Sequence, residues 1–310
     1  MLSPLFLVPL CRLNHNRHKN IDLMRFAYLI LAHSSFKLLR ELIVALDSPD
    51  NDIYVHVDLK AGDMDPIPFI KAAKYSNVCF LSKRINVYWG HISIVEATLN
   101  LMSEAAKGDY DYVHLLSGVD FPVKSQSYIQ SFFKEHDGKE FVGFSKVLNR
   151  RTLERRTVWR QLVKGRYEQT PKFILRLNSL FVTIQRKLHL HCTSPDSLKL
   201  GSQWFSITKS LALKLVNQKE QILKRYKHVL VPDEMFLQTY LYENNYMDRV
   251  YNPDDEFVSC CRYIDWSRGE PYVWQDEDYD ELVNSQYLWA RKFSESNMNL
   301  IHKIKEYIKE

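Results

Sequence analysis

Apolar runs and helical repeats alternate along the first half of this chain. The run Phe26–Ala32 is continuously apolar and predicts a buried strand, whereas apolar residues recur at three- and four-residue intervals between Leu38 and Leu46, which indicates a helix. The same alternation continues with strands expected at 53–57, 78–81, 112–116 and 141–144 and helices at 67–75, 92–106 and 128–135. This order predicts an α/β fold with a mostly parallel sheet and helices on both faces.

The second half of the chain is less regular between residues 149 and 200. Beyond it, the pattern predicts a strand at 204–207, helices at 211–216 and 235–242, and a closing amphipathic helix at 299–308. A chain of 310 residues is long enough for two domains, but α/β folds of this size often form one unit.

Composition excludes a disordered chain, because 45% of the residues are hydrophobic and 13% are aromatic. The five cysteines are odd in number and include no C-x-x-C pair, which favours a reducing compartment over a disulfide framework. No apolar run approaches the ~20 residues needed to span a bilayer. Residues 2–10 are apolar but short, and basic residues follow them, which is the reverse of a signal peptide.

The net charge of +5 is concentrated in one segment. Residues 146–187 contain twelve Lys or Arg against Glu154 and Glu168, a local charge of +10, so the rest of the chain carries 5 − 10 = −5. Such a segment could contact an anionic substrate, a nucleic acid or an anionic membrane, or it could be a solvated helix face.

Ligands of open parallel sheets bind beyond the carboxyl ends of the strands. Asp58 follows the strand at 53–57, where its carboxylate could accept hydrogen bonds from a ribose or a base, or simply cap the strand. The segment Ser117–Pro122 places Gly118 and Asp120 after the 112–116 strand, where backbone can approach a ligand or form a tight turn. Neither G-x-G-x-x-G nor G-x-x-x-x-G-K-[ST] occurs, so the usual phosphate cradles are absent.

Glu234 is the candidate general base. It follows Pro232 and precedes the helical pattern of 235–242, so we expect it in the first turn of that helix, where free N–H groups and the helix dipole would hold its carboxylate ionised. An ordinary N-terminal helix acid would look the same.

Other motifs have an equally plain alternative. Gly201–Phe205 places a glycine and small polar groups against aromatics, which suits a sugar ring or a strand start. The arginines near 262–268 and the segment 290–293 could clamp a diphosphate or be surface cations. Asp109 and Asp111 form a D-x-D, but they precede a strand and so lie at the wrong end of the sheet for a metal-bound nucleotide. His56 is expected to be a satisfied core histidine, and the aspartates of 276–280 a solvated loop.

Taken together, these segments resemble the core-2/I-branching enzymes, the family 14 glycosyltransferases that include peptide O-xylosyltransferases. The resemblance covers about residues 25–295 and rests on seven motifs in the same order: His56-Val57-Asp58, Val87-Tyr88-Trp89-Gly90, Leu116 to Pro122, Gly201 to Phe205, Pro232-Asp233-Glu234, Asp265-Trp266 and Ala290-Arg291-Lys292-Phe293.

The resemblance implies a single-domain, Rossmann-like nucleotide-sugar transferase fold of the GT-A type at 24–295. Its nucleotide-binding half would be 24–145 and its acceptor and catalytic half 146–295, with an N-terminal extension at 1–23 outside the core and a C-terminal helix at 296–310. It also implies inverting transfer of N-acetylglucosamine or xylose from a UDP-sugar to a hydroxyl of a glycan, lipid-linked or protein acceptor, with no metal and no other cofactor.

By position, Glu234 resembles the family's general base, Lys292 the cation that neutralises the leaving diphosphate, and Asp58 the uridine-binding aspartate. The full expected set is, on the donor side, Asp58, Tyr88, Trp89, Ser117, Gly118, Asp120, Arg262 and Lys292, and on the acceptor side, Gln203, Trp204, Asp233, Arg156 and Trp266. The family's second diphosphate-binding arginine has no clear counterpart, so Arg262 and Arg268 are candidates only.

The disulfides and membrane anchor of lumenal members also lack counterparts, which predicts a bacterial-type cytoplasmic protein, with peripheral contact at the inner membrane face as an option. The alternative function is a non-catalytic protein that binds nucleic acid or another anionic polymer through residues 146–187; the transferase interpretation involves no nucleic acid.

Overall fold

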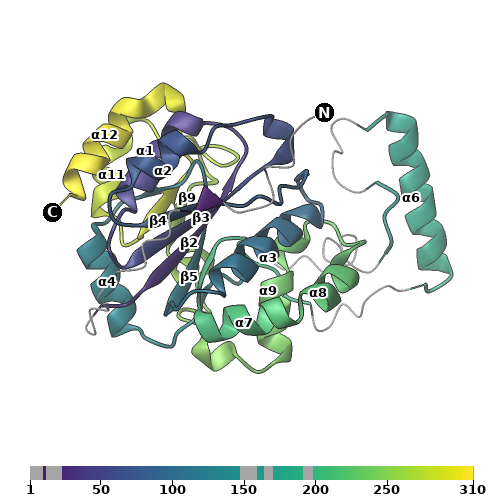
Figure 1. Cartoon of the computed structure of the whole chain (residues 1–310). Helices are drawn as coiled ribbons and strands as arrows, with labels where there is room; N and C mark the ends of the chain where they lie inside the picture. Colours follow the sequence, from purple (N-terminus) through teal and green to yellow (C-terminus); the bar gives the residue numbers. More distant parts are fainter. Residues whose placement is uncertain (1–9, 12–22, 147–158, 164–169, 191–197, 310) are drawn as a thin grey trace, which may run out of the picture.

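A seven-stranded sheet forms the centre of the protein in a computed structural model that describes residues 10–11, 23–146, 159–163, 170–190 and 198–309 (Figure 1). The strand order is β1-β4-β3-β2-β5-β8-β7. The bounds are β1 Leu10–Cys11, β2 Phe26–Ala32, β3 Asn51–Val57, β4 Asn77–Phe80, β5 Tyr112–Ser117, β7 Phe141–Val142 and β8 Phe205–Thr208. β4, β3, β2 and β5 are mutually parallel, and β1, β8 and β7 pair antiparallel, so the expected mostly parallel α/β sheet is confirmed.

A second, three-stranded sheet brings together distant segments of the chain. Its order is β6-β10-β9, with β6 at Phe121–Pro122, β9 at Arg262–Ile264 and β10 at Trp289–Arg291. The strands have two or three residues each, which is too short for a readable alternation, and the sequence pattern did not predict them. This sheet places the Phe121-Pro122 and Ala290-Arg291 motifs side by side.

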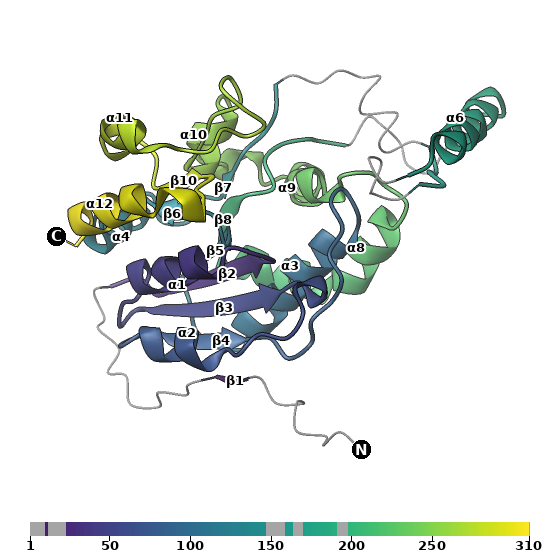
Figure 2. The same cartoon turned by 90° about the horizontal axis from the view of Figure 1, so that it is seen from above.

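Helices cover both faces of the main sheet (Figures 1 and 2). One face carries α1 Phe36–Ala45, α2 Ile67–Ala72, α4 Gln126–Glu135, α11 Tyr279–Asn284 and α12 Met298–Tyr307. The other carries α3 Ser93–Ala105, α7 Lys209–Asn217, α8 Lys219–Tyr226 and α9 Phe236–Glu243. The short α10 spans Glu256–Cys260, and α6, at Lys172–Lys187, stands apart from both layers. The strands and helices expected from the pattern are all present close to their expected bounds.

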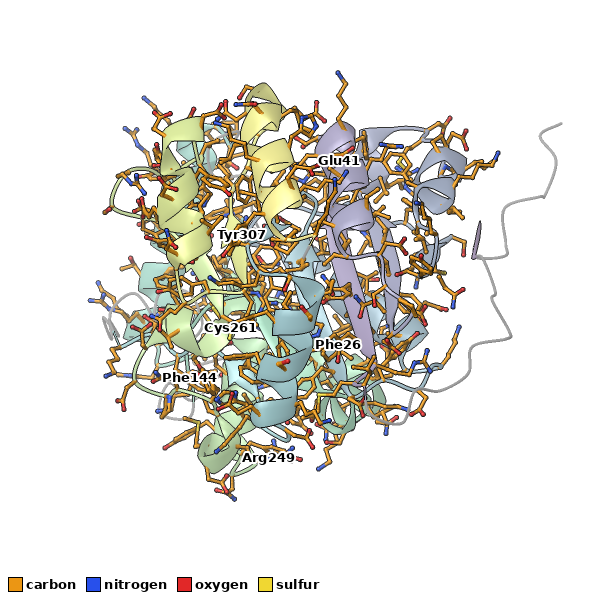
Figure 3. The ribbon with its side chains drawn as sticks, turned by 90° about the vertical axis from the view of Figure 1, so that its left-hand side faces the viewer. Phe26, Glu41, Phe144, Arg249, Cys261 and Tyr307 are labelled. Carbon is orange, nitrogen blue, oxygen red and sulfur yellow. The ribbon has the colours of Figure 1, made fainter. Side chains whose placement is uncertain are left out.

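Alternation along β2 explains the two apolar cores. Phe26, Tyr28 and Ile30 contribute to the core under α1 and α12, whereas Ala27 and Leu29 contribute to the core under α3 and α7. All five side chains are fully buried, as expected for the central strand of a sheet covered on both faces. Figure 3 looks onto the first of these helical layers.

Polar contacts tie the last helix to this layer. Glu41 lies on α1 beside α12 (Figure 3), and its carboxylate accepts a hydrogen bond from Lys305 Nζ. Burial opposes ionisation of Glu41, but this bond and the nearby cations outweigh it and lower the pKa of Glu41. The C-terminal helix is therefore packed into the fold.

The amino-terminal segment departs from expectation at β1. Leu10–Cys11 pairs antiparallel with β4, so these two residues of the supposed extension belong to the main sheet. Cys79 of β4 is disulfide-bonded and lies opposite Cys11 in the register, whereas Cys260 and Cys261 are free and buried. The disulfide at Cys79 departs from the expectation that favoured a reducing compartment over a disulfide framework, because an odd cysteine count does not exclude a bridge between some of the cysteines. Residues 1–9 and 12–22 lie outside the described part.

Candidate active site

Two of the predicted strand-end loops meet at the carboxyl end of β2. The Asp58 amide donates to the Ala32 carbonyl at 2.8 Å, and the Gly118 amide donates to the Leu31 carbonyl at 2.9 Å. A Cβ on Gly118 would lie 3.4 Å from the Ala32 Cβ, so this loop runs directly against β2. The expected convergence of Asp58 and Ser117–Pro122 at one edge of the sheet is confirmed.

Asp58 is buried and firmly oriented. Its Oδ1 accepts from the Lys60 amide at 2.9 Å and from the Val87 amide at 3.3 Å. Lys60 Nζ lies 3.4 Å from the other carboxylate oxygen and 4.5 Å from the centre of the Tyr88 ring. Asp58 is thus both a strand-end cap and a fixed acceptor beside an aromatic ring. The neighbouring Trp89 is 71% exposed, which leaves its indole free to stack on a ligand.

The loop carrying Trp89 is joined to the segment that carries Glu234. The Val231 amide donates to the Gly90 carbonyl at 2.9 Å, and a Cβ on Gly90, whose φ is +67°, would lie 3.4 Å from Val231 Cγ2. Val231 has φ 53° and ψ 52°, a left-handed conformation that is unfavourable for a β-branched residue. Such strain occurs at sites that the surrounding structure holds in place.

Glu234 does not lie in the first turn of an α-helix. It ends a short 3-10 turn, η4 at Pro232–Glu234, and Met235, at φ −137°, separates that turn from α9, which begins at Phe236. The expectation that the dipole of this helix holds the carboxylate is therefore wrong. The half-buried Glu234 is positioned by its backbone instead, because its carbonyl accepts from the Gly201 amide at 2.9 Å. Asp233 beside it is buried.

Gly201 begins a loop that leaves no room for a side chain. A Cβ there would lie 1.8 Å from the Gly143 carbonyl oxygen. Gln238 of α9, which is fully buried, donates to that oxygen at 3.1 Å and to the Ser202 carbonyl at 2.7 Å. These contacts fix the loop whose next residues are the half-buried Gln203 and the buried Trp204.

Asp120 and Arg291 connect the two sheets. Asp120 is fully buried; its carboxylate accepts from Ser117 Oγ at 2.6 Å and from the Ser117 amide at 2.8 Å. Arg291 Nε lies 3.8 Å from Asp120, and the guanidinium carbon lies 4.1 Å from the centre of a Trp204 ring. Direct donor contact by Asp120, as predicted, does not fit a carboxylate with no exposed surface. The structure instead gives it a positioning role for the Ser117 loop.

Lys292 follows β10 and is half-buried. Its amide donates to the Tyr272 carbonyl at 3.3 Å, and the Tyr272 amide donates to the Asp265 carbonyl at 2.8 Å, so Lys292 is tied to the Asp265-Trp266 motif. The next residue, Phe293, donates its amide to the Val119 carbonyl at 2.9 Å. Lys292 is thereby held beside the loop that follows β5, and Trp266, the residue after Asp265, is 57% exposed.

Arg262 is not a surface clamp for a diphosphate. It is fully buried, and its guanidinium donates to the Ser206 hydroxyl at 2.8 Å and to the carbonyls of Leu115, Phe205 and Cys260. Its guanidinium carbon lies 4.4 Å from the centre of a Trp289 ring. The donor-binding role predicted for Arg262 is therefore wrong, because its hydrogen bonds hold β5, β8 and α10 together.

Arg268 is also engaged by the protein. Its guanidinium pairs with Asp265, Asp278 and Glu281 and stacks over the Tyr272 ring at 4.3 Å. Asp278 is buried, so the expected solvated acidic loop is wrong at that residue. Of the cations predicted to bind diphosphate, Lys292 is the one whose side chain has no such structural assignment.

Direct contacts join the sequence motifs into a closed circuit at the carboxyl edge of the sheet. The links are Asp58 to Val87, Gly90 to Val231, Glu234 to Gly201, Trp204 to Arg291 and Arg291 to Asp120, and the end of β2 closes the circuit between Gly118 and Asp58. We call these residues the site rim: Asp58, Val87–Gly90, Ser117–Asp120, Gly201–Trp204, Val231–Glu234 and Arg291.

Glu256 is a carboxylate close to Glu234 that the sequence did not reveal. It begins α10, and a Cβ on Gly143 would lie 2.9 Å from its Cγ. Burial, and then the negative charge of Glu234, raise the pKa of Glu256. The motif search missed it because a lone glutamate between Asp255 and Phe257 carries no spacing signal.

Two predictions about groups outside the rim are confirmed. His56 is buried, its Nε2 accepts from the Ile85 amide at 3.1 Å, and burial lowers the pKa of His56 to about 4. Asp111 accepts from the Arg25 amide at 2.7 Å and Asp109 pairs with Lys209 at 3.1 Å, so this D-x-D lies at the amino end of β5. In the described part of the chain, no group of three His, Cys, Asp or Glu could hold a metal ion.

One cavity lies away from the rim. Its volume is about 360 Å³, its lining includes Asp47, Ser48 and Gln126, and it lies at the amino end of β3, so we assign it no part in the site.

Within the described ranges, no helix is long and apolar enough to cross a membrane.

The basic segment is only partly described. Arg156 lies outside the described residues. Trp159 and Arg160 lie in non-helical backbone, and Trp159 is buried, so these two do not continue a basic helix face.

Comparison with known proteins finds relatives over most of this chain. The chain is 23% identical to Xylosyltransferase oxt of Drosophila pseudoobscura pseudoobscura over 87% of its own length and 32% of that protein. It is 23% identical to Xylosyltransferase of Ciona intestinalis and 24% identical to Xylosyltransferase 2 of Rattus norvegicus, over 88% and 89% of this chain and 32% of each relative. The chain thus spans about a third of the length of these relatives. Residues 26–287 match the Core-2/I-Branching enzyme profile, and the chain therefore belongs to that glycosyltransferase family.

Proposed function

We propose that this protein is an inverting glycosyltransferase that moves a sugar from a UDP-sugar to an acceptor hydroxyl, with Glu234 as the general base. The observation that carries the proposal is the site rim, in which residues from Asp58 to Arg291 form one contact circuit at the edge where α/β sheets bind ligands. Membership of the family supports the reaction class.

The reaction assigns one role to each group. Glu234 takes the proton of the acceptor hydroxyl as its oxygen attacks the anomeric carbon, and the bond between that carbon and the diphosphate oxygen breaks. The electron pair leaves with UDP, whose charge the Lys292 ammonium offsets in place of a metal ion. Attack from the side opposite the leaving group inverts the anomeric centre.

Asp58 and Trp89 are the proposed nucleoside contacts. Asp58 is fixed by backbone amides and can accept from the uridine moiety, while the exposed Trp89 indole offers a stacking surface. Gln203, Asp233 and Trp266 remain proposed for the acceptor side. Similarity to xylosyltransferases favours xylose as the donor sugar, with N-acetylglucosamine as the other candidate.

A donor screen tests the proposal on the full chain. UDP-sugars are incubated with the protein, and UDP release is measured with EDTA in excess, because a leaving group stabilised by Lys292 needs no divalent ion. We expect slow hydrolysis of one donor that survives EDTA. Loss of activity in EDTA with rescue by Mn²⁺ would disprove the metal-free mechanism.

Glu234→Gln keeps the shape of the side chain and removes its basicity, so UDP release should fall by at least ~10²-fold while UDP still raises the melting temperature. Glu243→Gln is the matched control, because Glu243 of α9 pairs with Arg225 of α8 and is not part of the rim. Activity of Glu234→Gln within threefold of wild type would remove Glu234 from the mechanism.

A second candidate, a nucleic-acid or polyanion binder, rests on the basic segment alone. It would show salt-sensitive binding to unrelated polyanions and no thermal shift with UDP.

A further inference from the structure

α6 exposes its apolar face and buries polar residues. Surface helices of globular proteins normally bury an apolar stripe and expose polar residues. In α6 the buried residues are Asn178 and Gln185. The most exposed apolar side chains are Phe173, Leu177, Leu180, Ile184 and the C-cap Leu188, at 64%, 53%, 57%, 46% and 62%.

The orientation of α6 is set by hydrogen bonds. The Asn178 side-chain oxygen accepts from the amides of Leu162 and Val163 at 2.7 and 3.2 Å. Gln185 accepts from the Arg160 amide at 3.0 Å and donates to the Arg160 carbonyl at 2.9 Å. Asn178 and Gln185 are seven residues apart and so share one side of the helix, which is the side held by 160–163.

The exposed apolar residues form one continuous stripe on another side. Phe173, Leu177, Leu180, Ile184 and Leu188 follow the spacing i, i+4, i+7, i+11 and i+15, which at 3.6 residues per turn keeps them on one line along the helix. We call this line the α6 stripe. Figures 1 and 2 show that α6 stands away from the sheet and its covering helices.

Charge indicates what the α6 stripe contacts. α6 contains Lys172, Arg176, Arg186 and Lys187 and no Asp or Glu. Arg176 and Lys187 follow Phe173 and Ile184 by three residues and therefore border the stripe. A second copy of this chain would bring like charges together, whereas an anionic lipid surface offers hydrocarbon to the stripe and opposite charge to its border.

We propose that α6 is an interfacial helix that binds an anionic lipid bilayer through the α6 stripe. Its 16 residues give a length of about 24 Å, and its four cations exclude a spanning orientation, so the helix would lie in the headgroup layer. In Figure 2 the arrowheads of β2 and β3 point toward the side on which α6 lies, so a bound α6 brings the carboxyl edge of the sheet near the lipid surface. This binding does not depend on the proposed transfer reaction.

Vesicle co-sedimentation tests the proposal without any donor. The full chain is mixed with vesicles of phosphatidylcholine alone or of phosphatidylcholine with phosphatidylglycerol. We expect binding to the anionic vesicles that weakens as salt is added, and little binding to the neutral ones. Absence of binding to the anionic vesicles would overturn the proposal.

Leu177→Ser with Leu180→Ser should weaken binding by at least about tenfold, because two leucines no longer enter the hydrocarbon. The control is Ile67→Ser, which removes an exposed apolar side chain from α2, where Ile67 is 48% exposed. Arg176→Gln with Lys187→Gln should weaken binding and reduce its salt dependence.

Circular dichroism melting checks that each variant is folded, and UDP release in solution should be unchanged because none of these residues belongs to the rim. Wild-type binding by Leu177→Ser with Leu180→Ser would overturn the proposal. So would ultracentrifugation that shows a wild-type dimer and a monomeric double variant, because the stripe would then be an interface between copies.

Discussion

At the scale of single residues, burial separates the charged groups that hold the site from those available to a ligand. Asp120 and Arg262 are both fully buried and hydrogen-bonded to groups within the protein, although the family resemblance placed them among the donor contacts. Sequence motifs indicate which residues gather at a site, but they do not show which ones face it. How deeply a side chain is buried depends on packing between distant segments of the chain. For Arg262 it also depends on the short strands around it.

Arg262→Lys should lower the free energy of unfolding by at least about 3 kcal/mol. An ammonium has at most three donors and cannot reproduce the planar fork, so buried carbonyls of Leu115 and Phe205 would lose partners, at about 1–3 kcal/mol each. Urea unfolding measures the loss. Arg268→Lys, with a partly exposed side chain, should cost about 1 kcal/mol or less. A stable Arg262→Lys that loses UDP affinity would restore the donor role.

Glu256→Gln should change how stability depends on pH. Burial and the charge of Glu234 raise the pKa of Glu256, so the folded state favours its protonated form. The resulting stability is fully present below the unfolded pKa of about 4.3 and is lost as pH rises through the folded value. A glutamine at position 256 does not ionise, so the variant does not lose this stability as pH rises. Urea unfolding across pH should therefore show the variant gaining on wild type as pH rises, whereas a constant difference would refute the coupling.

At the scale of elements, the sequence pattern predicted most elements that have a readable repeat and missed the shortest ones and α6. Most strands of the main sheet and most of its covering helices carry runs or helical spacings long enough to read, as in β2 and α3, whereas β1, α8 and α11 were not predicted. β6, β9 and β10 are too short for a period, and η4 interrupts the approach to α9 because Met235 leaves helical dihedrals. The α6 stripe has helical spacing, but many cations surround it, so this segment was described by its charge and no helix was predicted there.

Gly90→Ala tests whether the contact between the Trp89 loop and Val231 matters for transfer. Gly90 and Gly138 both have positive φ, at 67° and 79°, so an alanine at either costs about 1 kcal/mol. A Cβ meets Val231 at Gly90 but nothing within 4 Å at Gly138. Both variants should therefore lose similar stability, while Gly90→Ala alone should reduce UDP release several-fold. Equal activity in the two variants would separate this loop from catalysis.

At the scale of the whole molecule, the circuit of the site rim explains why a one-domain fold can build this site. Its members come from residues 58 to 291, and the second sheet is what brings the last of them against the loop after β5. The amino-terminal segment supplies β1, an outer strand of the main sheet. The site lies at the carboxyl ends of the strands and not on this outer strand. The stability contributed by β1 can therefore be changed without changing the site.

Starting the chain at Met24 should lower the melting temperature by several degrees without changing UDP binding. The truncation removes β1, exposes the edge of β4, and removes the cysteine opposite the disulfide-bonded Cys79. Loss of a native disulfide typically costs about 2–5 kcal/mol, and in a domain of this size 1 kcal/mol corresponds to about 2–4 °C. Cys79→Ser in the full chain separates the two effects, because it keeps the strand and removes the bridge. UDP binding should persist because the rim lies at the carboxyl ends of β2, β3 and β5, whereas β1 contacts β4 alone among the described strands. If the truncated chain and the full chain have the same melting temperature, β1 contributes nothing to the stability of the fold and the amino-terminal segment is an extension outside the core.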